Sequence, residues 1–122
     1  MSIKVNKVNS REANLERFWI SQAGILKRDG KILILKMKKN NGLWDLPGGR
    51  LEKNENYKNG FVRELEEELN LKTVEIGPVV DYDIWYTEDR NIPVCVIACL
   101  IKTNDPIKLS EEHVDYRWID ST

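Results

Sequence analysis

The chain has 122 residues, of which 41% are hydrophobic, so its length and apolar content suit one domain with one modest core. Its 19 basic and 20 acidic residues leave a formal net charge of -1, which excludes the positive field that nonspecific binding to a nucleic-acid polymer requires. Apolar runs fall short of the roughly 20 residues that span a bilayer, and the polar start lacks the apolar core of a signal peptide. We therefore expect a single domain over residues 1–122, soluble and cytoplasmic, with no nucleic-acid polymer or membrane as partner.

Strand and turn patterns alternate along the first part of the chain. Residues 1–15 are polar and lack steady periodicity, which predicts a loose tail or a short edge element. The pattern predicts a strand over Phe18–Leu26, a hairpin turn over Arg28–Lys31 and a second, strongly apolar strand over Ile32–Met37. A polar loop is expected over residues 38–42.

The second half of the chain is again rich in strand patterns. Strands are expected over residues 73–76, 79–86, 92–102 and 116–119, with a turn at residues 88–91. Cys95 and Cys99 lie on the same face of one of these strands, too far apart in an extended chain for an easy disulfide. We expect them to be buried, reduced thiols.

Between the two halves the sequence predicts a helix with an acidic face. Asn56 is suited to be the N-cap of a helix that runs to about Leu69. On such a helix Glu64, Glu67 and Glu68 project from one face, where like charges repel. A Glu-rich stripe is also typical of a solvated surface. A divalent cation would remove the repulsion, and these hard oxygen ligands suit Mg²⁺ or Mn²⁺.

The residues around this helix favour the metal site over the solvated surface. Ahead of it lies Trp44–Glu52, in which paired glycines permit a sharp turn and close approach to a ligand. Residues 49–71 resemble the Nudix box, G-x5-E-x7-R-E-U-x-E-E-x-G-U, in which U is a bulky aliphatic residue. The matching residues are Gly49, Glu55, Arg63, Glu64, Leu65, Glu67, Glu68 and Leu71. The last box glycine is Asn70 here, a residue that also tolerates the left-handed backbone expected at a helix end.

The Nudix resemblance implies a fold and an activity. The fold would be an α/β/α sandwich with a mixed β-sheet and the box helix on one face. The activity would be hydrolysis of a diphosphate bridge in a small-molecule nucleotide, by attack of water on phosphorus with the help of Mg²⁺ or Mn²⁺. Members of the family usually continue past the final strand into a helix that covers the other sheet face, whereas this chain stops at Thr122. We expect an exposed apolar patch or a homodimer contact there.

The resemblance also implies roles for the box residues. Glu67 and Glu68 would be metal ligands, Glu64 would be either a ligand or the catalytic base, and the Gly48 carbonyl would add an oxygen. Arg63 would orient the carboxylates. Glu55 would act through water or by fixing the loop that contains Gly49, and Glu52 is either a further site acid or a solvated one.

Residues outside the box carry weaker signals. Glu112 precedes the last strand, where many Nudix proteins place a glutamate that acts as ligand or base, whereas the lone histidine, His113, is more typical of packing. We expect Trp44, Arg50 and Tyr86 to contact substrate. Other aromatic side chains that could reach the cleft are Trp19, Tyr82 and Trp85.

Three functions are therefore compared. The first is a metal-dependent hydrolase acting on a nucleoside triphosphate or a related nucleotide, with a diadenosine-polyphosphate hydrolase as an alternative because Tyr86 and the segment 109–118 resemble that subfamily. The second is a catalytically silent Nudix module that binds a nucleotide. The third is a structural protein with a merely acidic helix, which would not bind Mg²⁺ or Mn²⁺.

Overall fold

The structure is a computed structural model that describes residues 14–121, so most of the expected N-terminal tail lies outside the described residues. The strands and helices, in chain order, are β1 (Trp19–Arg28), β2 (Lys31–Met37), η2 (Asn40–Gly42), β3 (Trp44–Asp45), β4 (Gly48–Arg50), α1 (Tyr57–Leu69), β5 (Glu75–Tyr86), β6 (Pro93–Lys102) and β7 (His113–Asp120). Within the described residues, no helix is long and apolar enough to cross a membrane.

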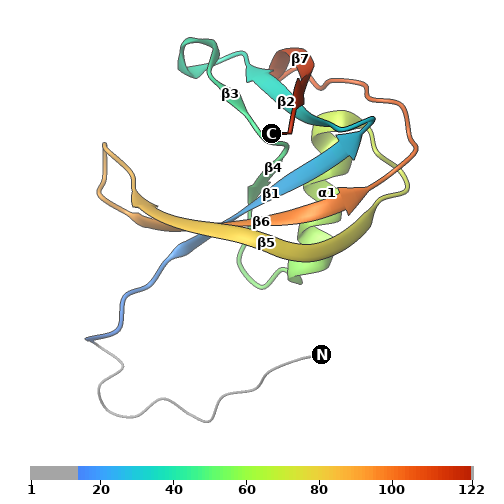
Figure 1. The fold of residues 1–122 in the computed structure, drawn as a ribbon. Helices are drawn as coiled ribbons and strands as arrows, with labels where there is room; N and C mark the ends of the chain where they lie inside the picture. Colours follow the sequence, from blue (N-terminus) through green and yellow to red (C-terminus); the bar gives the residue numbers. More distant parts are fainter. Residues whose placement is uncertain (1–13, 122) are drawn as a thin grey trace.

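The strands form one mixed sheet (Figure 1). Its order is β3-β2-β1-β6-β5, with β4 paired to β1 and β7 paired to β2. β1 and β6 run parallel over eight residue pairs, whereas the other pairings are antiparallel. The mixed sheet predicted from the resemblance is confirmed, and α1 is the one α-helix within residues 14–121.

Several strand boundaries differ from the prediction. The short strands β3 and β4 lie where the sequence predicted only a glycine turn, and β7 begins three residues before the predicted start at Tyr116. The two strands predicted over residues 73–76 and 79–86 are one continuous strand, β5, whose pairing with β6 shifts register around Gly77 and Pro78. Proline is tolerated there because β5 is at the edge of the sheet, where a missing N–H donor and an irregular register cost little.

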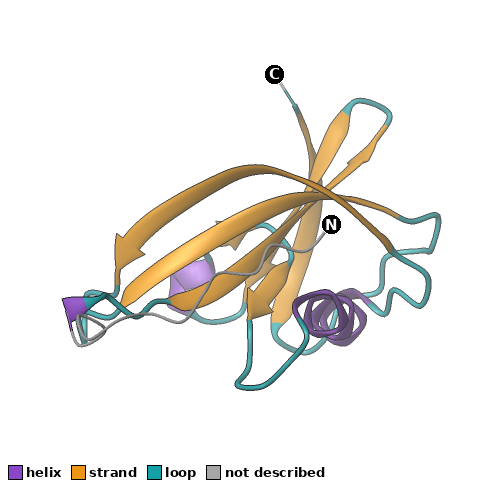
Figure 2. Cartoon of the chain, turned by 90° about the horizontal axis from the view of Figure 1, so that it is seen from below, coloured by secondary structure: helices purple, strands orange, loops and turns teal. Residues whose placement is uncertain are grey.

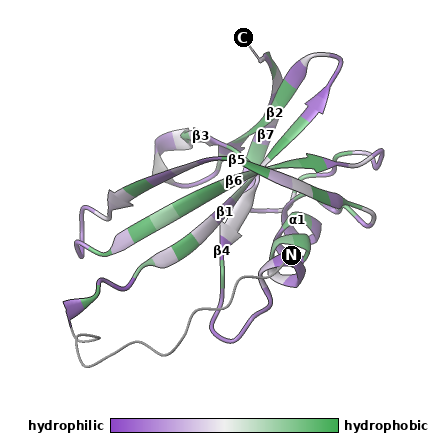
Figure 3. Ribbon diagram, turned by 60° about the horizontal axis from the view of Figure 1, so that its bottom comes forward, coloured by the Kyte–Doolittle hydropathy of each residue, from purple (hydrophilic) through white to green (hydrophobic). Residues whose placement is uncertain are grey.

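The hydrophobic core lies between α1 and the sheet. Figure 2 shows α1 to one side of the strands, and Figure 3 shows the hydrophobic colouring along the strands and the hydrophilic colouring in most connecting loops. Phe61, Leu65 and Leu69 of α1 are buried, and their four-residue spacing puts them on one face of the helix. They pack in one cluster with Leu26, Leu33, Leu35, Leu71, Cys99 and Ile101. Cys95 is half-buried rather than buried, and both cysteines are free thiols.

Exposed apolar side chains gather on β5 and β7. They are Val79, Val80, Tyr82, Ile84, Trp85 and Tyr86 on β5, and Val114, Tyr116 and Ile119 on β7. Because β2, β1 and β6 lie between these two strands in the sheet, the apolar patch and the homodimer contact expected beyond the final strand both stay predictions.

Both ends of α1 are capped by asparagines, as predicted. The Asn56 side-chain oxygen accepts hydrogen bonds from the backbone N–H groups of Lys58 and Asn59, at 3.0 and 3.1 Å. Asn70 ends the helix in the left-handed conformation, with φ of 58°, and its N–H donates to the Glu66 carbonyl. Asn54 also has a positive φ, of 61°.

The N-cap bonds predict a measurable loss of stability for Asn56→Ala. Two backbone N–H groups lose their acceptor, so the free energy of unfolding should fall by about 1 kcal/mol. Urea unfolding followed by circular dichroism measures the change. Asn59→Ala is the matched control, because this exposed residue lies inside the helix, where alanine is favourable; an equal loss in both variants would contradict the capping role.

Candidate active site

The site is built around the glycine turn between β3 and α1. β4 pairs antiparallel with β1, so that Gly48 lies opposite Ala23 and Arg50 lies opposite Ser21. The Gly48 N–H then donates a 2.6 Å hydrogen bond to Oε1 of Glu68 on α1. The turn and the acidic helix are thereby joined into one unit, although twenty residues separate the two partners.

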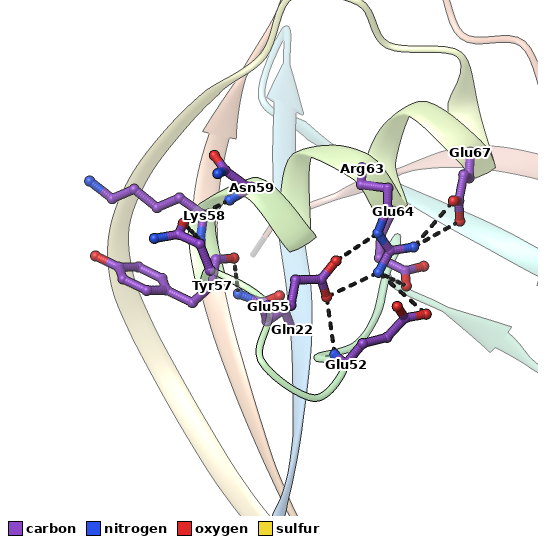
Figure 4. Close-up of polar contacts among 10 residues, drawn as sticks. Gln22, Glu52, Glu55, Tyr57, Lys58, Asn59, Arg63, Glu64 and Glu67 are labelled. Carbon is purple, nitrogen blue, oxygen red and sulfur yellow. Dashed lines mark hydrogen bonds and ion pairs between the residues drawn. The ribbon is translucent and has the colours of Figure 1, made fainter.

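Arg63 binds several carboxylates at once (Figure 4). Its guanidinium donates to both carboxylate oxygens of Glu55, at 2.7 and 3.1 Å, and to both oxygens of Glu67, at 3.2 Å. A further bond of 3.1 Å reaches Glu64, and Glu52 lies 3.8 Å away. The Arg63 side chain lowers the pKa of Glu55, which also accepts the Glu52 N–H. Arg63 is therefore placed to orient the box carboxylates, and Glu55 to hold both the loop and Arg63.

Glu64 lies beside the second glycine of the turn. Its side chain is 18% exposed, and a Cβ added to Gly49 would meet its carboxylate at 2.4 Å. Burial raises the pKa of Glu64, while the neighbouring Arg63 opposes the rise. The missing side chain of Gly49 thus leaves room for a carboxylate that is held close to the backbone.

Glu68 is the most enclosed acid of the helix, with a side chain that is 12% exposed. Its Oε2 lies 3.4 Å from Nε2 of His113, whose side chain is 7% exposed. Burial raises the pKa of Glu68 to about 8; the Gly48 N–H lowers it, and the charges of Glu64 and Glu112 raise it further. Burial likewise lowers the pKa of His113.

The loop before β7 is fixed against the end of α1. The N–H groups of Lys108 and Ser110 donate to the carbonyls of Leu69 and Glu68, at 3.1 and 2.9 Å. The Glu112 carbonyl accepts the Lys38 N–H at 3.0 Å. The first two bonds hold the loop that contains Glu112 against the end of the box helix, and a role of Glu112 as ligand or base stays a prediction.

Two hollows adjoin at these acids. The inner hollow, of about 280 Å³, is lined by Ser21, Gln22, Ala23, Met37, Asp45, Leu46, Gly48, Gly49, Glu64, Glu68, Val96, Glu112 and His113. The acidic hollow, of about 570 Å³, is lined by Glu52, Arg63, Glu64, Glu67, Glu68, Ser110, Glu111 and Glu112. Glu64, Glu68 and Glu112 line both hollows and so mark the place where the two meet.

The predicted substrate contacts lie outside the described lining of both hollows. Trp44 has the Arg117 guanidinium over its ring, 4.7 Å from the centroid. Arg50 lies 4.7 Å from the ring centroid of Trp19 in the same way, and Tyr86 is the exposed last residue of β5. A role for these residues in substrate binding stays a prediction.

Sequence reasoning missed most of the inner hollow. Asp45 and Met37 line it next to His113, and Ser21 and Val96 line it from β1 and β6. Asp45 is the one with a signal in the sequence, since it lies three residues before the first glycine of the turn. Its charge raises the pKa of both Glu68 and His113.

The acids that line the acidic hollow offer oxygen donors of the kind that a hard divalent cation prefers. Among residues 14–121 no three acidic, histidine or cysteine side chains are already close enough to hold a metal ion. Glu67 is bound by Arg63, and Glu68 is bound by Gly48. Burial raises the pKa values of Glu64 and Glu68, and the charges of neighbouring acids raise them further; a cation would stabilise the ionised carboxylates, and oxygen ligands of this kind suit Mg²⁺.

The pKa of Glu68 predicts how the stability of the metal-free protein depends on pH. Because the folded pKa, about 8, exceeds the ordinary glutamate value of about 4.5, the folded state binds more protons between these pH values than the unfolded state. The free energy of unfolding in EDTA should therefore fall, by a few kcal/mol at about 1.4 kcal/mol per pKa unit, as pH rises from about 5 to 8. Thermal unfolding across this pH range measures the change in stability. A slope that is equally steep in Glu68→Gln would contradict the assignment to Glu68.

Comparisons with known proteins identify the family of the chain. The NUDIX domain family matches residues 20–122. Nucleoside triphosphatase NudI of Escherichia coli O139:H28 is 31% identical over 108 residues, covering 78% of this chain and 77% of the relative. CTP pyrophosphohydrolase of Escherichia coli K12 is 42% identical over 53 residues, which cover 41% of this chain and only 39% of that enzyme. The crystal structure of a MutT protein from Methanosarcina mazei Go1 superposes with a TM-score of 0.75 at 28% identity, covering 86% of this chain and 78% of that one.

The chain therefore belongs to the Nudix hydrolase family. The family accounts for the loop-helix unit at residues 49–71. It also accounts for the mixed sheet that holds this unit, since the superposition covers most of the chain.

Proposed function

We propose that the protein is a metal-dependent hydrolase that cleaves a diphosphate bridge in a nucleoside triphosphate. The observation that carries this proposal is the meeting of the two hollows at Glu64, Glu68 and Glu112. A nucleotide that crosses this junction would have its uncharged part in the inner hollow and its phosphates beside the acids. The names of two relatives, a nucleoside triphosphatase and a CTP pyrophosphohydrolase, support the same substrate class.

The roles of the residues follow from their surroundings. Glu64, Glu67 and Glu68 would hold Mg²⁺ or Mn²⁺, with an oxygen from the Gly48 carbonyl. The bound ions would neutralise phosphate charge and lower the pKa of the attacking water. Arg63 keeps the carboxylates oriented, because it is bonded to Glu55 on one side and to Glu67 on the other.

The catalytic base is proposed to be either Glu64 or Glu112, because both line the junction. Glu64 is partly buried beside Gly49, whereas Glu112 is exposed on the loop before β7. A base must be within hydrogen-bond reach of the water from which it takes a proton. Comparing pH–rate profiles of Glu64→Gln and Glu112→Gln separates the two, since only loss of the base abolishes the limb that reports its ionisation.

The size of the inner hollow argues against the diadenosine-polyphosphate alternative. Its volume of about 280 Å³ is small for a ligand site, for which about 300–1,000 Å³ is usual, so it suits one nucleoside rather than two. Tyr86, the residue that suggested this subfamily, lies at the exposed end of β5. A nucleoside triphosphate is therefore the favoured substrate.

A substrate panel tests the proposal. The purified protein is assayed with the common ribo- and deoxyribonucleoside triphosphates and with diadenosine polyphosphates, in Mg²⁺ and in EDTA. Reaction in ¹⁸O-labelled water then shows which phosphorus is attacked. We expect Mg²⁺-dependent release of a nucleoside monophosphate and pyrophosphate, or of a diphosphate and phosphate. Binding of a triphosphate by calorimetry without any turnover would favour the binding module instead.

A further inference from the structure

The imidazole of His113 is enclosed beside the acidic helix. Its side chain is 7% exposed, and its Nε2 lies 3.4 Å from Oε2 of Glu68. The other oxygen of the same carboxylate, Oε1, accepts the Gly48 N–H at 2.6 Å. Each carboxylate oxygen of Glu68 therefore has its own neighbour, Gly48 of β4 for Oε1 and His113 of β7 for Oε2.

The surroundings of the second ring nitrogen indicate which tautomer His113 adopts. Nδ1 is buried and has no hydrogen-bond partner among residues 14–121. A buried N–H without an acceptor is rarer and more costly than an unused lone pair. The proton of the neutral ring is therefore on Nε2, the nitrogen that lies 3.4 Å from Oε2 of Glu68, and Nδ1 carries the lone pair.

The backbone around His113 is fixed to both sides of the site. His113 pairs with Met37 of β2, and its N–H donates to the Ser110 carbonyl at 3.4 Å. Ser110 in turn donates to the backbone carbonyl of Glu68 at 2.9 Å. The imidazole is thus held in a constant position relative to the carboxylate that it faces.

We propose that His113 is a positioning residue, whose Nε2–H holds the Glu68 carboxylate in the orientation that binds the metal ion. This inference rests on the proposed function, because it assigns His113 a role in that same site. A carboxylate ligand that is held by hydrogen bonds loses less rotational freedom on binding, and removal of such a partner typically weakens metal binding by about 10- to 100-fold. His113 acts through Glu68 and not on the substrate.

The test uses three variants of His113. For each variant, the affinity for Mn²⁺ in the absence of nucleotide is measured from the EPR signal of the free ion. His113→Gln retains a side-chain amide that can reach the Nε2 position and should bind Mn²⁺ within about threefold of the unaltered protein. His113→Asn is too short to reach it, and His113→Phe fills the space without a donor. Both should bind at least about tenfold more weakly. At saturating Mn²⁺, the kcat of His113→Gln should recover more than the kcat of His113→Asn, and KM should change little in both variants.

The chain contains one histidine, so its ring nitrogens can be assigned without ambiguity by ¹⁵N NMR. We expect Nε2 to be the protonated nitrogen and its resonance to shift when Mg²⁺ is added. A ring protonated on Nδ1, or Asn and Phe variants that bind Mn²⁺ as tightly as the unaltered protein, would overturn the inference. Because the Gln and Asn variants form a matched pair, the comparison holds even if the Phe variant does not fold.

Two further variants separate failure of this inference from failure of the proposed function. Glu68→Gln should lose Mn²⁺ affinity whether or not His113 has the proposed role. If it does not, the proposed metal site is wrong, and so is the role of His113. If Glu68→Gln is impaired while the Asn and Phe variants are not, only the role of His113 is wrong. Val114→Ala, an exposed change on the same strand, should leave Mn²⁺ binding unaltered.

Discussion

Glu68→Gln is expected to lower kcat by about two to three orders of magnitude. A bound cation stabilises transition-state charge by several kcal/mol, and each 1.36 kcal/mol corresponds to about a tenfold change in rate. Glutamine keeps the size of the side chain and an oxygen that can accept the Gly48 N–H, so the fold should remain intact. Steady-state kinetics with the best triphosphate of the panel, over a range of Mg²⁺ concentrations, measures the loss.

Glu66→Gln is the matched control for this experiment. Glu66 lies on the same helix, two residues before Glu68, but its side chain is 51% exposed and paired with Lys72. It lines neither the inner nor the acidic hollow. Its replacement should leave kcat within about twofold of the unaltered protein, since exposed ion pairs of this kind contribute about 0–1 kcal/mol. Equal losses in the two variants, or none in Glu68→Gln, would contradict a metal role for Glu68.

The local features of the site could be predicted because they depend on residues near one another in the chain. Asn56 and Asn70 cap the helix at the predicted positions, and Phe61, Leu65 and Leu69, spaced four residues apart, form its buried face. Helix ends are decided by hydrogen bonds within one or two turns. A sequence pattern therefore contains nearly all the information that determines them.

The distribution of carboxylates within the site depends on tertiary structure, and the sequence predicted it less well. The Nudix resemblance implied that Glu67 and Glu68 are both metal ligands. In the structure Glu67 is 59% exposed and bound to Arg63, whereas Glu68 is 12% exposed between β4 and β7. The difference arises because the glycine turn and His113 come from distant parts of the chain to cover one end of the acidic face.

The walls of the inner hollow could not be predicted from the sequence for a related reason. Ser21 and Val96 line it together because β1 and β6 pair in parallel, 75 residues apart along the chain at that point. Neither residue type suggests a function by itself. Strands of two or three residues such as β3 and β4 are likewise set by their partners rather than by their own composition.

Gly48→Ala is expected to lower the free energy of unfolding by about 3 kcal/mol or more. Gly48 has a φ of +151°, which L side chains rarely adopt, and an added Cβ would lie 1.8 Å from the backbone oxygen of Gln22. Backbone strain and overpacking each cost about 1–3 kcal/mol, and a backbone atom in a paired strand cannot move away cheaply. Urea unfolding measures the loss.

Gly30→Ala separates the cost of backbone strain from the cost of overpacking. Gly30 also has a positive φ, of 75°, but nothing lies within 4 Å of its added Cβ, so only the backbone strain of about 1–2 kcal/mol should appear. The excess loss in Gly48→Ala then measures the close approach of β4 to β1. That approach is also what directs the Gly48 N–H to Glu68, so a folded Gly48→Ala protein should bind Mn²⁺ more weakly than Gly30→Ala. Equal stability and equal Mn²⁺ affinity in the two variants would show that the turn does not hold the carboxylate.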